Sequence, residues 1–127
     1  MTTIPTDLRY SAQHEWVAQR ADGRALIGVS AVATDALGEL VYIELPAVGS
    51  TLTVDTVCGE IESTKSVSEL YAPVSGTVVE VNDSVTDNPA ILNDDPYGDG
   101  WLIVVAVTAE GALLSADEYA RENGVDL

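Results

Sequence analysis

Short hydrophobic runs rich in Val, Ile and Thr, separated by polar turns with Gly and Pro, cover most of the chain, a pattern typical of β-strands. Residues 15–20 and 25–30 form two such runs around Ala21-Asp-Gly-Arg24, whose Asp-Gly pair favours a hairpin turn. Residues 101–107 are apolar at nearly every position. Because a strand covered on both faces is apolar throughout, 101–107 is predicted to lie at the centre of a sheet.

Two segments instead carry helix signals. Residues 31–37 are predicted as a short helix that stops at Gly38, since glycine often follows the last helical turn. Residues 116–123 are predicted as a second helix, with Ser115 as its N-cap and Gly124 at its end. These two helices flank a chain that is otherwise predicted to be mainly β.

Two further segments resemble each other. An apolar strand is predicted at 40–45, and the following residues 46–54 combine a Pro-x-x-Gly turn with a Val-rich strand. Residues 73–81 repeat this combination 27 positions later. The likeness is too degenerate for a repeat protein, but it suggests two similar β halves packed face to face.

The segment between them, 57–71, is predicted to form a hairpin. Alternation places one set of side chains on one face and the next set on the other: Val57, Gly59 and Ile61 against Cys58, Glu60 and Glu62. This alternation fails at residues 63–66, where small polar residues replace the apolar ones. The tip of the hairpin is therefore expected there, with Lys65 at or beside the turn.

Composition narrows the class of protein. The length of 127 residues suits one domain spanning 1–127, and 46% hydrophobic residues exclude an intrinsically disordered chain. No apolar run approaches the roughly 20 residues of a membrane span, and residues 1–8 have no signal-peptide pattern. The single cysteine, Cys58, suits a reducing compartment. We therefore expect a soluble cytoplasmic protein.

The net charge of the chain limits the classes of molecule that it can bind. Five Lys and Arg residues against 21 Asp and Glu residues give a net charge of −16. Such a surface repels phosphate backbones and anionic membranes, which excludes nucleic-acid and membrane binding. It favours partners with basic docking patches, although acidity that only maintains solubility gives the same composition.

Motifs for catalysis or metal binding are weak. A nucleophile would have to be Cys58 or a serine activated by the sole histidine, His14. No Gly-x-Ser-x-Gly motif occurs, and acids around Cys58 would raise its pKa. Residues 93–100 superficially resemble a calcium loop, but the register puts Ala106 where glutamate is required. No glycine-rich nucleotide motif occurs. We expect no catalytic residues and no metal site.

Lys65 has a more specific pattern. It is the only lysine of the chain, and its neighbours Ser63, Thr64 and Ser66 are small enough to admit a modifying enzyme. A lysine that reacts as a nucleophile needs burial or a nearby cation, which lowers its pKa. Here Glu60, Glu62 and Glu69 surround it along the chain and favour the protonated form. Lys65 therefore suits a substrate of modification better than a catalyst.

Longer motifs carry a resemblance to a known family. They are His14-Glu-Trp16, Leu37-Gly-Glu-Leu-Val-Tyr-Ile-Glu-Leu-Pro-Ala-Val-Gly49, Gly59-Glu-Ile-Glu-Ser-Thr-Lys65, Tyr71-Ala-Pro-Val-Ser-Gly76, Val81-Asn82, Asn88-Pro89, Leu92-Asn93 and Pro96-Tyr-Gly-Asp-Gly-Trp101. With these motifs the chain resembles the H-protein family of the glycine cleavage system, within the lipoyl and biotinyl carrier fold. The likeness extends over nearly the whole chain.

The resemblance implies a fold and a cofactor. The expected fold is a flattened barrel-sandwich hybrid of two antiparallel sheets, with a short helix after the first hairpin and a C-terminal helix. The expected cofactor is lipoate, joined by an amide bond to Lys65. Biotin carriers favour Met on both sides of the lysine and other lipoyl domains favour Asp before it, whereas Thr64 and Ser66 flank it here.

The resemblance also implies partners. The lipoyl arm would receive an aminomethyl group from glycine at a decarboxylase (P protein) and deliver it to an aminomethyltransferase (T protein). Dihydrolipoamide dehydrogenase (L protein) would then reoxidise the arm, and a lipoate ligase or an octanoyl or lipoyl transferase would install it. The chain itself would have no catalytic activity and would act as a monomer.

Two glutamates match family positions near the loaded arm. Glu15 corresponds to the cleft glutamate of the His-Glu-Trp motif, and Glu69 stands where the family commonly has Asp. We hypothesise that both hold the aminomethylated arm, because a carboxylate is the natural partner of an amine. His14 and Trp16 are interpreted as packing residues of the first strand.

Some positions depart from the family pattern. Ser66 replaces a common Ala, Cys58 replaces a large apolar residue, Ile103 follows Trp101-Leu102 where a basic residue is common, and residues 30–33 lack an Asp and an aromatic ring. The attachment motif is unaffected by these changes. Alternative functions are a lipoyl relay or storage protein for other complexes, a biotin carrier, and an unmodified binding module.

Overall fold

The computed structural model describes residues 4–20 and 22–125, which form nine strands and four helices. The strands are β1 (Arg9–Tyr10), β2 (Glu15–Gln19), β3 (Arg24–Val29), β4 (Leu40–Glu44), β5 (Thr51–Leu52), β6 (Val57–Ser63), β7 (Val67–Tyr71), β8 (Val74–Val81) and β9 (Ile103–Glu110). The helices are α1 (Ala31–Leu37), α2 (Asp83–Asp87), α3 (Ile91–Asp94) and α4 (Ala116–Asn123).

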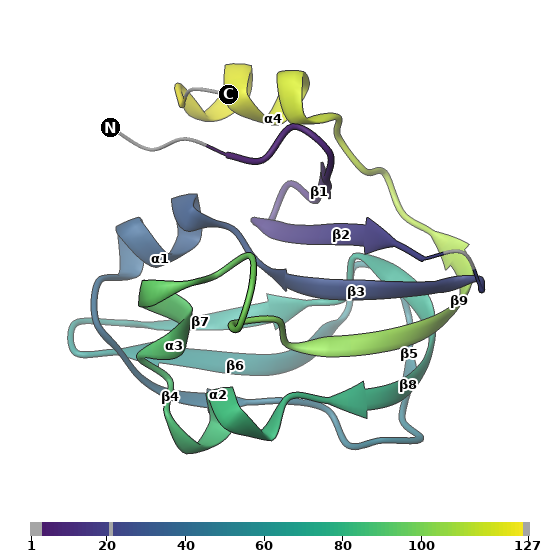
Figure 1. The fold of residues 1–127 in the computed structure, drawn as a ribbon, viewed down its shortest axis with the longest axis horizontal. Coiled ribbons are helices and arrows are strands. Elements are labelled where there is room, and N and C mark those ends of the chain that lie inside the picture. Colours follow the sequence, from purple (N-terminus) through teal and green to yellow (C-terminus); the bar gives the residue numbers. More distant parts are fainter. Residues whose placement is uncertain (1–3, 21, 126–127) are drawn as a thin grey trace.

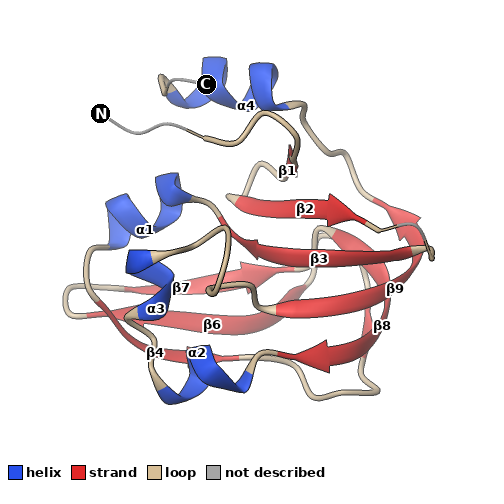
Figure 2. Cartoon of the chain, in the orientation of Figure 1, coloured by secondary structure: helices blue, strands red, loops and turns tan. Residues whose placement is uncertain are grey.

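The strands form two antiparallel sheets (Figures 1 and 2). The larger sheet has the order β1-β2-β3-β9-β8-β5, and the smaller has the order β4-β6-β7. Among the described residues no ladder joins the two sheets into a closed barrel. Two antiparallel sheets, a helix after the first hairpin and a C-terminal helix confirm the predicted fold class.

The main core fills the space between the sheets. It is lined by inward-facing aliphatic side chains of both sheets, including Ile27, Val78, Val105, Ile43 and Ile61, all almost fully buried. This burial follows the period-2 alternation of the strands, because every second side chain points to the same face. The alternation in the sequence thus decides which face of each strand meets the core.

A second hydrophobic cluster attaches α4 to the outside of the larger sheet. The rings of Tyr10 and Tyr119 stack with centroids 4.4 Å apart, and Trp16 is buried in the same cluster. Helix α4 begins with a complete capping box between Ser115 and Glu118. The C-terminal helix is therefore fixed both by its own cap and by aromatic packing.

Several predicted elements are confirmed. Strands β2 and β3 form the first hairpin, although Ala21 of its predicted turn lies outside the described residues. Strand β9 lies between β3 and β8, as expected for the apolar run. Helices α1 and α4 have the predicted bounds, and Gly38 and Gly124 end them with positive φ angles. None of the described helices has the length and apolarity needed to cross a membrane.

The helices α2 and α3 were not predicted. They contain five and four residues, too few to show a helical period in the sequence. The side chain of Asn82 caps α2 by accepting a hydrogen bond from the Ser84 backbone N–H, 3.2 Å away. Tertiary contacts of Val85 and Leu92, both fully buried, hold these short helices against the main core.

The prediction of two similar β halves packed face to face is wrong. Strands β5 and β8, which contain the two Val-rich segments, are hydrogen-bonded neighbours in one sheet, with Thr51 opposite Thr77. Residues 74–76 belong to β8 itself, so the second Pro-x-x-Gly is no turn. Gly76 lies at a bulge, where a Cβ atom would collide with the Ala106 carbonyl oxygen of β9. Close strand packing therefore explains this glycine.

Candidate functional site

The hairpin of β6 and β7 presents Lys65 to solvent. Strand β6 ends at Ser63 and strand β7 begins at Val67. The connection between them consists of residues 64–66, all of which are exposed. In Figure 1 this turn lies at the left end of the molecule. The predicted location of Lys65 at the tip is confirmed, and no ion pair involves it among the described residues.

Ser63 organises the turn. Its backbone N–H donates to the Ser66 carbonyl oxygen at 2.8 Å, and its Oγ accepts from the backbone N–H groups of Ser66 at 3.0 Å and Lys65 at 3.3 Å. Ser63 is buried and remains in phase with Gly59 and Ile61, so the expected failure of alternation at residue 63 is wrong. The alternation continues because a buried hydroxyl with hydrogen-bond partners can take an inward position.

The connection from α1 to β4 supports the tip. The Thr64 N–H donates to the Glu39 carbonyl oxygen at 3.1 Å. Asn93 of α3 fixes this connection, because its Oδ1 accepts from the Leu40 N–H at 3.0 Å and its Nδ2 donates to the Gly38 carbonyl oxygen at 2.8 Å. Sequence reasoning missed this role of Asn93, since the bonded residues lie more than 50 positions apart in the chain.

Gly38 lies beside the lysine stem. A Cβ atom at Gly38 would lie 3.7 Å from Lys65 Cε, and its φ of 82° is a left-handed conformation that suits glycine. The lysine stem thus lies beside the end of α1 while its amine remains at the surface. An exposed primary amine on a turn fixed by hydrogen bonds fits covalent attachment of an acyl group.

Glu15 occupies a very different environment. Its side chain, on the first residue of β2, is only 2% exposed. Its carboxyl oxygens accept hydrogen bonds from Ser11 Oγ and from the Tyr71 backbone N–H, the latter at 3.3 Å. This second bond connects β2 of the larger sheet to the end of β7 in the smaller sheet.

Burial changes the protonation of this region. It raises the pKa of Glu15 from 4.5 to about 7, although the hydrogen bonds from Ser11 and Tyr71 oppose the shift. Burial also raises the pKa of the Cys58 thiol to about 12, and the nearby Glu15 carboxylate adds to that shift. The expectation that the surroundings of Cys58 raise its pKa is confirmed, with burial as the larger cause.

Glu69 is exposed on β7 and lies opposite Glu60 of β6. Tyr71 donates a hydrogen bond to each of the two glutamates. Its hydroxyl donates to Glu69 Oε1 at 3.4 Å, and its backbone N–H donates to Glu15. A groove of about 380 Å³ is lined by Glu69, Glu60 and Cys58 among others. The structure therefore connects both predicted glutamates to Tyr71 by hydrogen bonds, one glutamate buried and one exposed.

The three side chains of the His-Glu-Trp motif have separate partners. His14 precedes β2 with a φ of 73°, and its Nδ1 lies 2.6 Å from the Tyr119 hydroxyl of α4. Trp16 is buried, and its Nε1 donates to the Pro96 carbonyl oxygen at 3.0 Å. Both contacts fit the interpretation as packing residues, although His14 lies just outside the strand.

The segment that superficially resembles a calcium loop, residues 93–100, consists of the end of α3 and the turns that follow it. Asp95 Oδ2 accepts from the Asp99 N–H at 2.9 Å, so this carboxylate stabilises the turn itself. Within residues 4–20 and 22–125 no group of three or more His, Cys, Asp or Glu side chains could hold a metal ion.

Comparison with known proteins gives consistent results. A family model described as "Glycine cleavage H-protein" matches residues 8–123. The "Glycine cleavage system H protein" of Corynebacterium aurimucosum is 54% identical, with 99% of this chain and 100% of the relative covered. The protein of the same name from Streptomyces avermitilis is 50% identical, with 94% and 97% covered.

A solved structure agrees over the whole fold. The crystal structure of a glycine cleavage system H protein from Mycobacterium marinum matches with a TM-score of 0.92 and 50% sequence identity. The match covers 96% of this chain and all of that one.

Proposed function

Since the chain belongs to the glycine cleavage H-protein family, whose members are lipoyl carriers in glycine cleavage, we propose that Lys65 bears the lipoyl group. One observation supports this most directly. The only lysine of the chain is exposed at a hairpin turn that Ser63 fixes through both its backbone and its hydroxyl. An attaching enzyme, a lipoate ligase or an octanoyl or lipoyl transferase, needs an amine presented in this way.

The lipoyl group supplies a dithiolane that accepts a one-carbon unit together with electrons. The chain moves this group between glycine decarboxylase (P protein), an aminomethyltransferase (T protein) and dihydrolipoamide dehydrogenase (L protein). The chain contributes presentation of the arm and no catalysis of its own. The environments of Cys58 and His14, the candidate nucleophile and base, support this. Burial raises the pKa of the Cys58 thiol to about 12, which disfavours the reactive thiolate, and His14 contacts the Tyr119 hydroxyl.

Glu15 and Glu69 hold the aminomethylated arm in this proposal. The amine of the loaded arm is a cation when protonated, and a partly desolvated carboxylate binds such a cation strongly. Glu15 supplies the buried carboxylate, and Glu69 supplies an exposed one beside the groove over Cys58. Because the pKa of Glu15 is raised to about 7, retention should weaken as the pH falls below 7 and Glu15 takes up a proton.

We also propose a cytoplasmic monomer that binds neither nucleic acid nor membranes. A single cysteine that is free and a net charge of −16 support this. The relatives are named as glycine cleavage system H proteins, which does not favour the lipoyl relay, the biotin carrier or the unmodified binding module.

Intact mass tests the attachment. The chain expressed in its native host should carry one lipoyl adduct, and Lys65→Arg expressed in parallel should carry none. An adduct with the mass of biotin, an unmodified chain, or a lipoyl adduct that persists in Lys65→Arg would overturn the proposal.

The rate of aminomethyl loss tests the two glutamates. Loaded Glu15→Gln and Glu69→Gln chains should lose the group faster than the wild type. As the pH falls from 8 to 6, the rate should rise in the wild type and in Glu69→Gln, which keeps Glu15, but not in Glu15→Gln. Glu80→Gln, an exposed position on β8, is the control for a change of net charge. Equal rates in all four proteins would exclude a retaining role.

A further inference from the structure

The smaller sheet has an outer face whose side chains are exposed or partly exposed, and the register arranges this face in two rows. The row nearer the Lys65 turn contains Tyr42, Glu62 and Val67, which lie opposite one another on β4, β6 and β7. The next row contains Glu44, Glu60 and Glu69. We call these six side chains the outer face.

Large apolar residues are exposed on and around the outer face. Every exposed large hydrophobic residue of the described chain lies on the smaller sheet or in the loop after β4, with exposures of 44–62%: Val41, Tyr42, Val48, Val57 and Val67. Irregular register contributes to this, because the β4–β6 ladder shifts between Leu40 and Tyr42 and the β6–β7 ladder shifts between Val57 and Gly59. Bulges of this kind redirect side chains and are common next to functional sites.

The row of three glutamates is unfavourable for folding. Like charges directly opposite each other on neighbouring strands destabilise a sheet. No described cation forms an ion pair with Glu44, Glu60 or Glu69. Glu44 accepts a hydrogen bond from the Tyr42 hydroxyl and Glu69 accepts one from the Tyr71 hydroxyl, each at 3.4 Å. This negative potential is therefore available to a partner that supplies positive charge.

Two grooves are lined in part by residues of the outer face. The groove of about 380 Å³ contains Glu44, Glu60, Glu69 and Val57 in its lining. A second groove, of about 390 Å³, is lined by Tyr42, Pro46 and Val48 among others, and it shares Glu44 with the first. Apolar and acidic side chains thus line both grooves.

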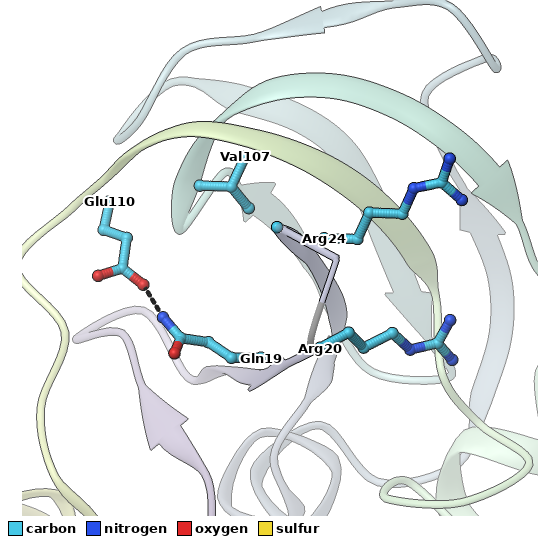
Figure 3. A pocket seen from close by; sticks show the side chains of 6 residues that line it. Gln19, Arg20, Arg24, Val107 and Glu110 are labelled. Carbon is cyan, nitrogen blue, oxygen red and sulfur yellow. Dashed lines mark hydrogen bonds between the residues drawn. The ribbon is translucent and has the colours of Figure 1, made fainter.

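The arginines of the chain lie outside the smaller sheet, and one of them, Arg24, forms an ion pair with Asp22 at 3.7 Å. Arg20 and Arg24 project in the same direction from the first hairpin (Figure 3), which lies at the right end of Figure 1, opposite the Lys65 turn. Arg9 forms an ion pair with Glu110 at 3.2 Å, and the Gln19 amide also donates to Glu110. A charge distribution of this kind orients an approaching molecule, so a basic partner should meet the Lys65 end first.

We propose that the outer face is the docking surface for the glycine-decarboxylating enzyme, whose complementary surface is an apolar patch bordered by arginine and lysine. An active site that receives the carboxylate of glycine is expected to present such cations near its entrance. Docking on the outer face brings Lys65, which lies just beyond the Tyr42 row, to that entrance. This inference rests on the proposed function, because it names a partner of the same arm.

Direct binding to purified glycine decarboxylase of the same host tests the docking surface. All variants carry Lys65→Arg, which keeps the charge but cannot accept an acyl group, so binding is measured independently of lipoylation. Adding Glu44→Gln and Glu60→Gln should raise Kd about tenfold or more at low salt. A control with Glu80→Gln and Glu122→Gln, both exposed and outside the smaller sheet, should change Kd less than about twofold.

Two further measurements complete the test. Added salt should weaken the binding of the Lys65→Arg parent more than that of the variant that also carries Glu44→Gln and Glu60→Gln. Salt screens the charges of Glu44 and Glu60, which only the parent retains. Val57→Ser with Val67→Ser should raise Kd at every salt concentration. Equal Kd changes in the test and control pairs, or no binding by the parent, would overturn the docking surface. Failure of the lipoyl proposal would instead appear in the intact mass, which these experiments do not use.

Discussion

The Lys65 turn and the Glu15 pocket differ in how they are constructed. Lys65 is exposed, and its turn is fixed mainly by hydrogen bonds that the backbone N–H groups of Lys65 and Ser66 donate to the Ser63 hydroxyl, two residues before Lys65. Glu15 is 2% exposed, and its carboxyl binds Tyr71, 56 positions away in the chain. One site depends on local sequence and the other on the meeting of two sheets.

This difference teaches how substitutions should act. An exposed lysine has little influence on the free energy of unfolding, so changes there affect function alone. A buried carboxyl couples function to stability, because its charge is costly in the interior. Four predictions test this contrast.

The largest effect should follow Lys65→Arg. Glycine exchange with decarboxylase should fall to the background rate, because the arm has no attachment point, whereas the free energy of unfolding should change by less than about 0.5 kcal/mol. Exchange assays and urea unfolding on the same preparation measure both quantities. A marked loss of stability would show that Lys65 also serves the fold and would break the contrast.

The next effect concerns Glu15 and pH. Its pKa is raised from 4.5 to about 7 in the folded chain, so the folded state binds more protons than the unfolded state between these values. Its contribution to stability is therefore full below pH 4.5 and is lost as the pH rises through 7, by about 3 kcal/mol. Glu15→Gln should gain stability relative to the wild type by about this amount from pH 4.5 to 8.

Urea unfolding of Glu15→Gln, Glu80→Gln and the wild type across this pH range measures the effect. Glu80→Gln reports the consequence of removing one exposed charge. Parallel pH profiles for all three proteins would contradict the buried, proton-binding state of Glu15.

A smaller effect is expected for Ser63→Ala. The backbone N–H groups of Lys65 and Ser66 lose their acceptor in a partly buried turn, which should cost about 1–2 kcal/mol. Ser66→Ala is the matched control, because the described contacts of Ser66 use its backbone, and it should stay within about 0.5 kcal/mol. Thermal unfolding compares the two. Equal losses would mean that the Ser63 hydroxyl has no special role in the turn.

The smallest effect should be a gain in stability. Glu60 lies between Glu44 and Glu69, so Glu60→Gln removes repulsion on both sides and should stabilise the fold by about 0.2–1 kcal/mol at low salt. The gain should shrink as salt is added. A loss of stability would show that Glu60 has a structural partner, and the outer face would then resemble the Glu15 pocket more than the Lys65 turn.

Local patterns in the sequence predicted much of this fold. The capping residues Ser115 and Gly124 and the apolar run of β9 predicted their elements because each acts through neighbours in the chain. The short helices α2 and α3 could not be predicted, since burial of Val85 and Leu92 in a distant core stabilises them. Pairing of β5 with β8 was missed for the same reason, because register between distant strands leaves no local pattern.

The sequence by itself determined the alternating strands, the two capped helices, the acidic charge and the presentation of one lysine on a turn. These features depend on the preferences of residues that are neighbours in the chain and on the overall composition, and neither of these requires a particular tertiary structure. Only the tertiary structure decided that Ser63 faces inward, that Asn93 fixes the support of the tip, and that three glutamates lie abreast on one face. It also decided the burial of Glu15 and hence its raised pKa, because desolvation arises only when separate segments pack together.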